Sequence, residues 1–378
     1  MRSFVGFSHH THPELAITEA TRDWPTTCPD LVFIFSSSRQ NPDSLRQVLE
    51  TRYPTALIVG CTSAGESPAG LATSGSVSMA GLYTPRVRWA AELIAPLSEF
   101  HAADARHAVF NAFNHLQVDL DLLEPDECIA VLLCDGLSKK EEQVAEAVAE
   151  ALQGIPVVGG SAGDDMAFKQ TYVTGPGYTR NNAAVLLVGH GPAGFFHAIK
   201  HQHFEPRGVA LAVTRAVPEE RRVYEIDGFP AVDAYARALN IAPTQLASAA
   251  FLNPVLITIQ DIPYIRSVQQ VHGDGSLTFY CGVEEGWILD LATHRPMEQA
   301  LAADLAPLTH SPTPIDFCLG FNCVLRAIEA RERGLQKLLA KTLANTAHNA
   351  LAFETYGEIS QGLHINQTLV ALALTQAA

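Results

Sequence analysis

Two glycine-rich segments carry the residues with the clearest potential for chemistry. They run Gly60-Cys61-Thr62-Ser63-Ala64-Gly65-Glu66 and Gly159-Gly160-Ser161-Ala162-Gly163-Asp164, and each follows an apolar run typical of a buried strand. Loops at strand ends are where α/β sheets bind ligands, and glycine lets backbone N–H groups approach a ligand closely. Neither segment has the spacing of a phosphate loop or a dinucleotide fingerprint. Each is therefore a loop for small polar groups or a tight turn between packed elements.

A third polar segment, residues 354–368, lies near the end of the chain. It places Tyr356, Glu358, His364 and Asn366 around two glycines. This composition is typical of a binding loop, although a hairpin that satisfies its own backbone is the alternative. We expect this segment and both glycine loops to open onto one site. Together with Arg266, they could hold a small polar metabolite such as an amino acid.

Three of the 15 histidines recur at every second or fourth position: His197, His201 and His203. In a continuous strand they would point to one face. His203 is followed by Phe204 and Pro206, apolar neighbours that suit a pocket with one coordinating imidazole. The alternative is an ordinary half-exposed strand.

The candidate nucleophiles are Cys61 and Cys323. No local signature ties either thiol to a base, and neither a Gly-x-Ser-x-Gly elbow nor a His-Glu-x-x-His motif occurs. Buried cysteines commonly act as small apolar residues. We therefore expect no catalytic activity, with a thiol-dependent enzyme as the open alternative.

Composition excludes several classes of protein. The formal net charge of -15 disfavours nucleic-acid binding, which depends on clustered Lys and Arg. No apolar run approaches the length of a membrane-spanning helix, and the seven cysteines include no Cys-x-x-Cys pair. We expect a cytoplasmic protein with reduced thiols and neither a disulfide framework nor a structural zinc site.

The pattern of elements predicts two lobes. Over residues 1–224, apolar β-branched runs alternate with helical patterns, which favours an α/β lobe. Over residues 225–378, hairpin-like strands predict a mixed or antiparallel α+β lobe with one long helix over 327–346. We find no short internal repeat. The clearest elements are strands at 31–35, 56–60, 129–133 and 183–188, a helix at 42–51, and a helix at 139–152 with a Ser138/Glu141 capping box.

Taken together, the two glycine loops and the terminal motif resemble the FIST family of sensory domains, over about residues 3–374. The match in the terminal motif covers Tyr356-Gly357-Glu358 and Gly362-Leu363-His364-Ile365-Asn366-Gln367-Thr368. The resemblance implies a ligand-sensing protein of bacterial type, with FIST N-terminal and C-terminal lobes.

Within that family the chain looks most like stand-alone haem-binding nitric-oxide sensors. The segments that carry this likeness are Cys134-Asp135-Gly136-Leu137-Ser138, His203-Phe204-Glu205-Pro206, residues 223–231 and residues 264–269. The likeness implies haem on a histidine, with His203 as metal ligand, nitric oxide as signal, and a histidine kinase, diguanylate cyclase or phosphodiesterase as partner. The segment 320–326 departs from the family, because Phe and Asn stand where relatives tend to have Cys and Asp. A metabolite sensor, a thiol-dependent enzyme and a protein-interaction scaffold remain as alternatives.

Overall fold

The chain, described here over residues 1–376 of a computed structural model, divides into two compact units. Unit 1 comprises residues 1–201, 301–364 and 369 onward, and unit 2 comprises residues 202–300 and 365–368. The predicted two-lobed α/β class is confirmed. Among the helices in this part of the chain, none is long and apolar enough to cross a membrane.

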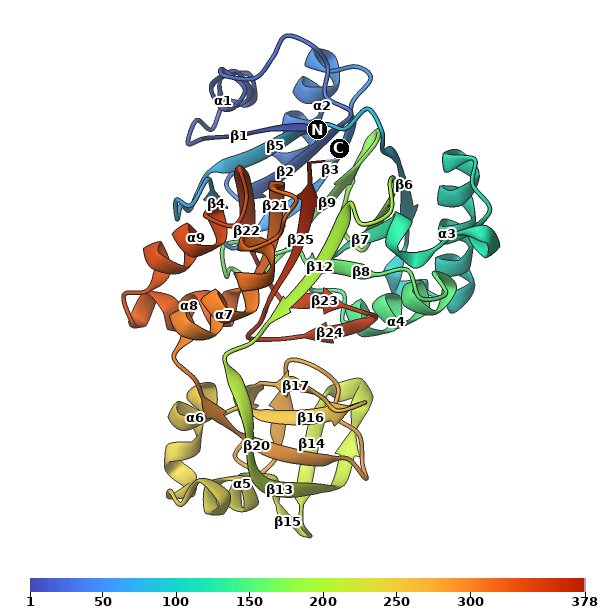
Figure 1. The fold of residues 1–378 in the computed structure, drawn as a ribbon. Coiled ribbons are helices and arrows are strands. Elements are labelled where there is room, and N and C mark those ends of the chain that lie inside the picture. Colours follow the sequence, from blue (N-terminus) through green and yellow to red (C-terminus); the bar gives the residue numbers. More distant parts are fainter. Residues whose placement is uncertain (377–378) are drawn as a thin grey trace. The chain divides into compact units, whose positions relative to one another are not determined.

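Unit 1 contains three copies of one basic arrangement, strand, helix, strand, helix, strand, short strand, strand, to which the second and third copies add elements (Figure 1). The first copy consists of β1 (Arg2–Ser8), α1 (Pro13–Ala20), β2 (Leu31–Ser37), α2 (Pro42–Arg52), β3 (Leu57–Ser63), β4 (Glu66–Pro68) and β5 (Val77–Tyr83). The second consists of β6 (Arg88–Ile94), α3 (Ala102–Leu116), β7 (Cys128–Cys134), α4 (Glu141–Ala151), β8 (Val157–Ser161), β9 (Val173–Gly175) and β11 (Ala184–His190), with β10 (Tyr178–Arg180) added before β11.

The third copy is interrupted by unit 2. It begins with β12 (Phe196–His201), and the chain returns to it through α7 (Met297–Thr309). The remaining elements are β21 (Ile315–Cys323), α8 (Val324–Glu332), α9 (Gln336–Ala344), β22 (Asn349–Thr355), β23 (Glu358–Ser360), β24 (Leu363–Ile365) and β25 (Leu369–Thr375). The third crossover is thus made by two helices, where each of the first two copies uses one.

The three sheets have matching strand orders, β1-β5-β2-β3, β6-β11-β7-β8 and β12-β25-β21-β22. In each sheet the last two strands are parallel and the other pairs are antiparallel. The short strand of each copy leaves its own sheet: β4 pairs with β22, β9 pairs with β3, and β23 pairs with β8. Every sheet is therefore extended by a strand from another copy, and the three exchanges form a closed cycle.

Apolar packing explains why these segments form sheets and helices. Strands β2, β7 and β25 are buried at every position, as expected for strands covered on both faces. Helices α1 and α2 cover the sheet of β2, and α3 and α4 cover the sheet of β7. Stacked aromatic rings, Phe33 on Phe317 and Phe35 on Phe353, join the first and third sheets directly.

Unit 2 is built on one antiparallel sheet in the order β17-β16-β20-β13-β14-β19-β18, with β15 paired to β14. The predicted antiparallel texture is confirmed. Its elements are β13 (Phe204–Val217), β14 (Arg222–Ile226), β15 (Phe229–Pro230), α5 (Ala231–Leu239), α6 (Leu246–Ala249), β16 (Val255–Ile259), β17 (Ile262–Arg266), β18 (Val268–Val271), β19 (Leu277–Phe279) and β20 (Ile288–His294).

Most predicted elements of unit 1 are confirmed, and three expectations about its helices and strands differ from the structure. The helix expected over 327–346 is split into α8 and α9, because Gly334 has a φ of 69°. The Ser138/Glu141 capping box does not form, since Lys140 is the N-cap residue of α4. The strand expected through His203 ends at His201, so the three histidines do not share one strand face. The border predicted between residues 224 and 225 falls inside β14, whereas the compact units change at 201/202 and 300/301.

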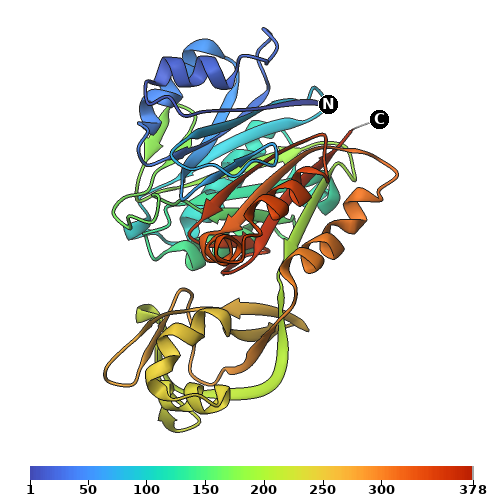
Figure 2. The same cartoon turned by 90° about the vertical axis from the view of Figure 1, so that its left-hand side faces the viewer.

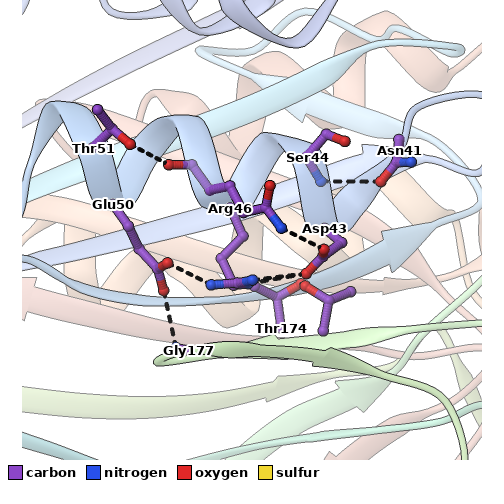
Figure 3. A network of polar contacts seen from close by, with 10 residues as sticks. Asn41, Asp43, Ser44, Arg46, Glu50, Thr51, Thr174 and Gly177 are labelled. Carbon is purple, nitrogen blue, oxygen red and sulfur yellow. Dashed lines mark hydrogen bonds and ion pairs between the residues drawn. The ribbon is translucent and has the colours of Figure 1, made fainter.

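Helix α2 is fastened to the β9–β10 turn by a buried arginine (Figure 3). The Arg46 side chain is 9% exposed and makes ion pairs with Asp43 and Glu50. Glu50 also accepts a hydrogen bond from the backbone N–H of Gly177, at 2.9 Å. Since α2 belongs to the first copy and β9–β10 to the second, this network links two copies.

Replacing this cation should weaken the link. In Arg46→Met, Asp43 and Glu50 would stand close together without a counter-charge, so the free energy of unfolding should fall by about 1–2 kcal/mol. Chemical denaturation measures this change, with Arg22→Met as the control because Arg22 is 74% exposed. Equal stability of the two variants would contradict a linking role for Arg46.

Candidate functional site

The three sequence motifs meet in one place, which we call the loop ring: residues 62–66, 161–165 and 354–358. Each loop follows the second parallel strand of its copy, β3, β8 or β22. Each contains a Ser or Thr, then any residue, then Gly and an acidic residue: Ser63-Ala64-Gly65-Glu66, Ser161-Ala162-Gly163-Asp164 and Thr355-Tyr356-Gly357-Glu358. The structure thus brings both glycine loops and the start of the terminal motif together, as the sequence indicated.

Backbone hydrogen bonds close the ring, two at each junction. The first and third loops exchange Ala64 N–H to Glu354 C=O at 3.0 Å and Glu354 N–H to Gly65 C=O at 2.7 Å. The second and first loops are joined by Gly163 N–H to Thr62 C=O at 3.0 Å and Asp165 N–H to Ser63 C=O at 3.1 Å. The third and second loops are joined by Ser161 N–H to Gly357 C=O at 2.8 Å and Tyr356 N–H to Ser161 C=O at 3.0 Å. These N–H groups are therefore committed to holding the fold.

The glycines of the motifs permit close approach of neighbouring backbone. A Cβ on Gly60 would lie 1.7 Å from the carbonyl oxygen of Ile34, and one on Gly159 would lie 1.9 Å from that of Leu132. A Cβ on Gly163 would lie 2.8 Å from the nitrogen of Ala64, and one on Gly160 would lie 2.6 Å from the Thr355 methyl group. These positions tolerate no side chain, which accounts for the two glycine-rich segments structurally.

Each acidic residue of the loop ring is held by hydrogen bonds. Glu66 accepts from the hydroxyls of Ser63 and Ser76, and burial raises its pKa to about 7. Asp164 accepts from the backbone N–H groups of residues 168–170 and from the Tyr356 hydroxyl. Glu358 accepts from the Thr355 hydroxyl. In the same region His364 Nε2 and the Ser161 hydroxyl are 3.1 Å apart.

A cavity of about 50 Å³ lies between helices α8 and α9 and the sheet of the third copy. Figure 2, turned from the first view, shows these orange and red helices beside the red strands of that sheet. Small side chains leave the space open, since five alanines are among its lining residues: Ala72, Ala327, Ala330, Ala340 and Ala352. Its polar lining comes from Glu66, Ser67, Asn322, Arg326, Gln336 and Glu354. A cavity of this size has room for a few water-sized groups.

Arg326 is the unusual group of this cavity. Its side chain is 3% exposed, and its Nη1 donates to Asn322 Oδ1. Its Nε and Nη2 have no hydrogen-bond partner among residues 1–376. Burial lowers the pKa of Arg326 to about 10, so the guanidinium still carries its charge at neutral pH. Buried charged donors without a partner are costly, so a group that accepts hydrogen bonds from them would be stabilising here.

Glu354 stands beside Asn322 on the adjacent parallel strand, because β21 and β22 pair in that register. Its carboxylate forms an ion pair with Arg331 at 3.2 Å, and burial raises its pKa to about 7. The carboxyl carbon would be 2.8 Å from a Cβ on Gly65. The glycine of the first loop thus makes room for Glu354 at the edge of the cavity.

The remaining candidate residues lie elsewhere. Cys61 is buried in β3, where burial raises its pKa, and Cys323 is the buried N-cap residue of α8. Neither geometry is that of an exposed thiolate nucleophile. His203, Phe204, Pro206, Arg266 and Asn366 belong to unit 2.

Within unit 2, these residues make contacts of their own. The ring of His203 packs on Phe204 at 4.4 Å and on His294 at 5.1 Å between centroids. Arg266 donates to the carbonyl oxygens of Ile265 and Gly282, and Asn366 accepts from the Cys281 thiol. Because His203 is buried in this structure, a porphyrin on its imidazole would require the packed rings to separate.

Sequence reasoning missed Arg326 and Glu354 as site residues. The segment 320–326 stood out only because it departs from the resembled family. The available signal was the four-residue spacing between Asn322, at the end of an apolar strand, and Arg326, in the helix that follows. A lone arginine at such a spacing is usually solvated, so only its burial reveals it.

The close approach of Gly65 and Glu354 can be tested by a double-mutant cycle. Gly65→Ala should displace the Glu354 carboxyl group and lower the free energy of unfolding by about 1–3 kcal/mol. Most of this loss should vanish in a Glu354→Ala background, because the obstructing group is then gone. Gly273→Ala is the control, since a Cβ there would meet nothing within 4 Å. An equal loss in both backgrounds would contradict the contact.

The raised pKa of Glu354 predicts a pH-dependent stability. In the unfolded chain Glu354 ionises near its ordinary pKa of about 4.3, whereas in the folded protein it stays protonated up to about pH 7. Between these two pH values, the contribution of Glu354 to the free energy of unfolding therefore falls as the pH rises. Relative to wild type, Glu354→Gln should therefore gain about 1–3 kcal/mol between pH 5 and pH 7.5. Urea denaturation at both pH values measures this, with exposed Glu332→Gln as control. A difference that does not change with pH would contradict the burial argument.

Comparison with known proteins assigns the family. The FIST N domain model matches residues 30–228, and the FIST C domain model matches residues 231–361. The comparison with curated proteins finds no match. Among solved structures, the PurLQS structure from Thermotoga maritima is 9% identical, with 99% of this chain and 72% of that chain covered, and its TM-score of 0.20 supports no argument about fold. Since the two family models together cover most of the chain, it belongs to the FIST family of sensory domains and has a ligand-sensing role.

Proposed function

We propose that this protein senses a small polar metabolite, such as an amino acid, held in the cavity under α8 and α9, and that it has no catalytic activity of its own. The observation that carries the proposal is the buried guanidinium of Arg326, which has two unpartnered donors within the part of the chain that the structure describes. A polar ligand would satisfy these donors, while the alanine and leucine side chains around them would exclude water. The position of the cavity between a helix pair and a sheet suits a sensor, because a ligand there can shift the helices.

The output is proposed to pass to a partner, a histidine kinase or an enzyme that makes or degrades cyclic-di-GMP. This part of the proposal rests on the resemblance of the chain to stand-alone sensors of the family. We expect the protein to act in the cytoplasm, where its seven free cysteines would remain reduced.

Haem on His203, the ligand that the family likeness favoured first, is the second candidate. The paired imidazoles of His203 and His294 beside Phe204 are the observation that favours it, because imidazole and aromatic groups are the surroundings haem prefers. The tight packing of these rings argues against it, since no step of binding can begin without their separation. We therefore rank the metabolite ahead of haem and nitric oxide.

A thiol-dependent enzyme is the weakest candidate. Cys61 and Cys323 are both buried, and burial raises the pKa of the Cys61 thiol. The thiolate is the nucleophilic form, so Cys61 in this position would be inert at neutral pH.

A cavity-filling variant tests the proposal. A panel of amino acids and other small metabolites should include a compound that raises the Tm of the wild-type protein, because a ligand that binds only the folded state stabilises it. Ala340→Leu places extra carbon atoms in the cavity and should abolish this rise in Tm. Ala302→Leu, at an exposed position of α7, should keep it.

The same wild-type protein distinguishes the haem alternative from the metabolite proposal. If no compound of the panel raises the Tm, and protein from haem-supplied cells shows a Soret band that His203→Ala removes, the metabolite proposal fails and haem takes its place. A rise in Tm that Ala340→Leu retains would also overturn the assignment of the cavity.

A further inference from the structure

We propose that the ligand of this cavity is a small monocarboxylate whose carboxylate group binds the Nε–Nη2 edge of Arg326. This inference rests on the proposed function and specifies the chemistry of its ligand.

Arg326 lines the cavity, and one edge of its guanidinium lacks hydrogen-bond partners in the described chain. Asn322 accepts from Nη1, which fixes the plane of the group from one side. The two nitrogens without partners in the described chain are Nε and Nη2. Their N–H bonds point the same way from the planar fork, and this pair matches the two oxygens of a carboxylate. A ligand with a single acceptor atom would have to share that atom between the two buried donors.

The charges near Arg326 leave its hydrogen-bonding needs unmet. Asn322 is neutral, so its hydrogen bond orients the guanidinium without cancelling the charge. Glu329 and Glu358 act on Arg326 through their charges, but neither accepts a hydrogen bond from Nε or Nη2. An incoming carboxylate would provide the missing hydrogen bonds, which are stronger when the acceptor carries a charge.

The cavity also limits the ligand to one negative charge. Glu354 lies on the adjacent strand and already pairs with Arg331, so a second carboxylate on the ligand would find no further free cation in the lining. The opposite wall consists of aliphatic side chains, which suits a short apolar tail. The lining residues of that wall are Ala327, Ala330, Leu339, Ala340, Leu343 and Leu369.

A matched pair of probes tests whether the ligand must carry a negative charge. Propionate and propionamide have nearly the same shape, and only propionate offers two anionic oxygens. Titration calorimetry with the full chain should show that propionate binds at least tenfold more tightly than propionamide. Equal affinities for the two probes would overturn the inference.

A substitution beside Arg326 tests whether this residue binds the carboxylate. Asn322→Asp supplies an internal carboxylate to the guanidinium, so it should weaken propionate binding at least tenfold and raise the Tm of the ligand-free protein. Asn114→Asp adds the same charge at an exposed position of α3 and should change neither quantity. Arg326→Met should abolish binding, and the Asn322 variant keeps the test valid if the methionine variant fails to fold.

The outcomes separate this inference from the proposed function. If a neutral or cationic compound raises the Tm of wild type but not of Ala340→Leu, while propionate does not bind, the cavity is a metabolite site and the carboxylate assignment is wrong. If Asn322→Asp binds propionate as tightly as wild type, Arg326 does not hold the carboxylate. If Ala340→Leu changes the binding of no compound, both the proposed function and this inference fail.

Discussion

The backbone hydrogen bonds that close the loop ring are the constraint on which the rest of unit 1 depends. Each junction joins the end of one copy's parallel strand to the loop of another, so no copy completes its hydrogen bonding alone. The exchanged strands β4, β9 and β23 begin directly after or close to these loops, and their pairing follows from the same crossing. The glycines and small hydroxyl residues of the motifs are therefore needed mainly because the three loops pack closely together.

The cavity arises because the third copy departs from this pattern. In the first two copies a single helix, α2 or α4, packs its apolar side on the sheet. In the third copy the crossover is made by α8 and α9 with a turn at Gly334, and alanines occupy the side facing β21 and β22. Looser packing at this position leaves space, and Arg326 brings a charge into it. The three repeated copies thus form the structural scaffold of unit 1, while the altered third copy contains the candidate site.

Much of the fold could be predicted from the sequence, because buried strands such as β2 and β7 are apolar at nearly every position and helices such as α2 and α4 follow periodic patterns. The threefold repetition could not be predicted, because only the four-residue loop motifs repeat visibly in the sequence. The residues of unit 2 also separate the third motif from the other two along the chain. The insertion of unit 2 also explains why the border near residue 224 differs from the compact units. The meeting of the three loops was predictable from their chemistry, but Arg326 was not, because burial of one arginine is a property of the packed structure. The role of His203 stays a prediction.

The most direct measurement of the central claim is the ¹⁵N-edited NMR signal of the Arg326 Nε–H group, assigned by its absence in Arg326→Lys, during a titration with propionate. Binding of a carboxylate to the Nε–Nη2 edge predicts a downfield shift of this proton and slower exchange with water, because the hydrogen bond becomes charge-assisted and shielded. The dependence of this shift on propionate concentration should give the same affinity as calorimetry. An Arg326 Nε–H signal that stays unchanged while propionate saturates the protein would contradict the account.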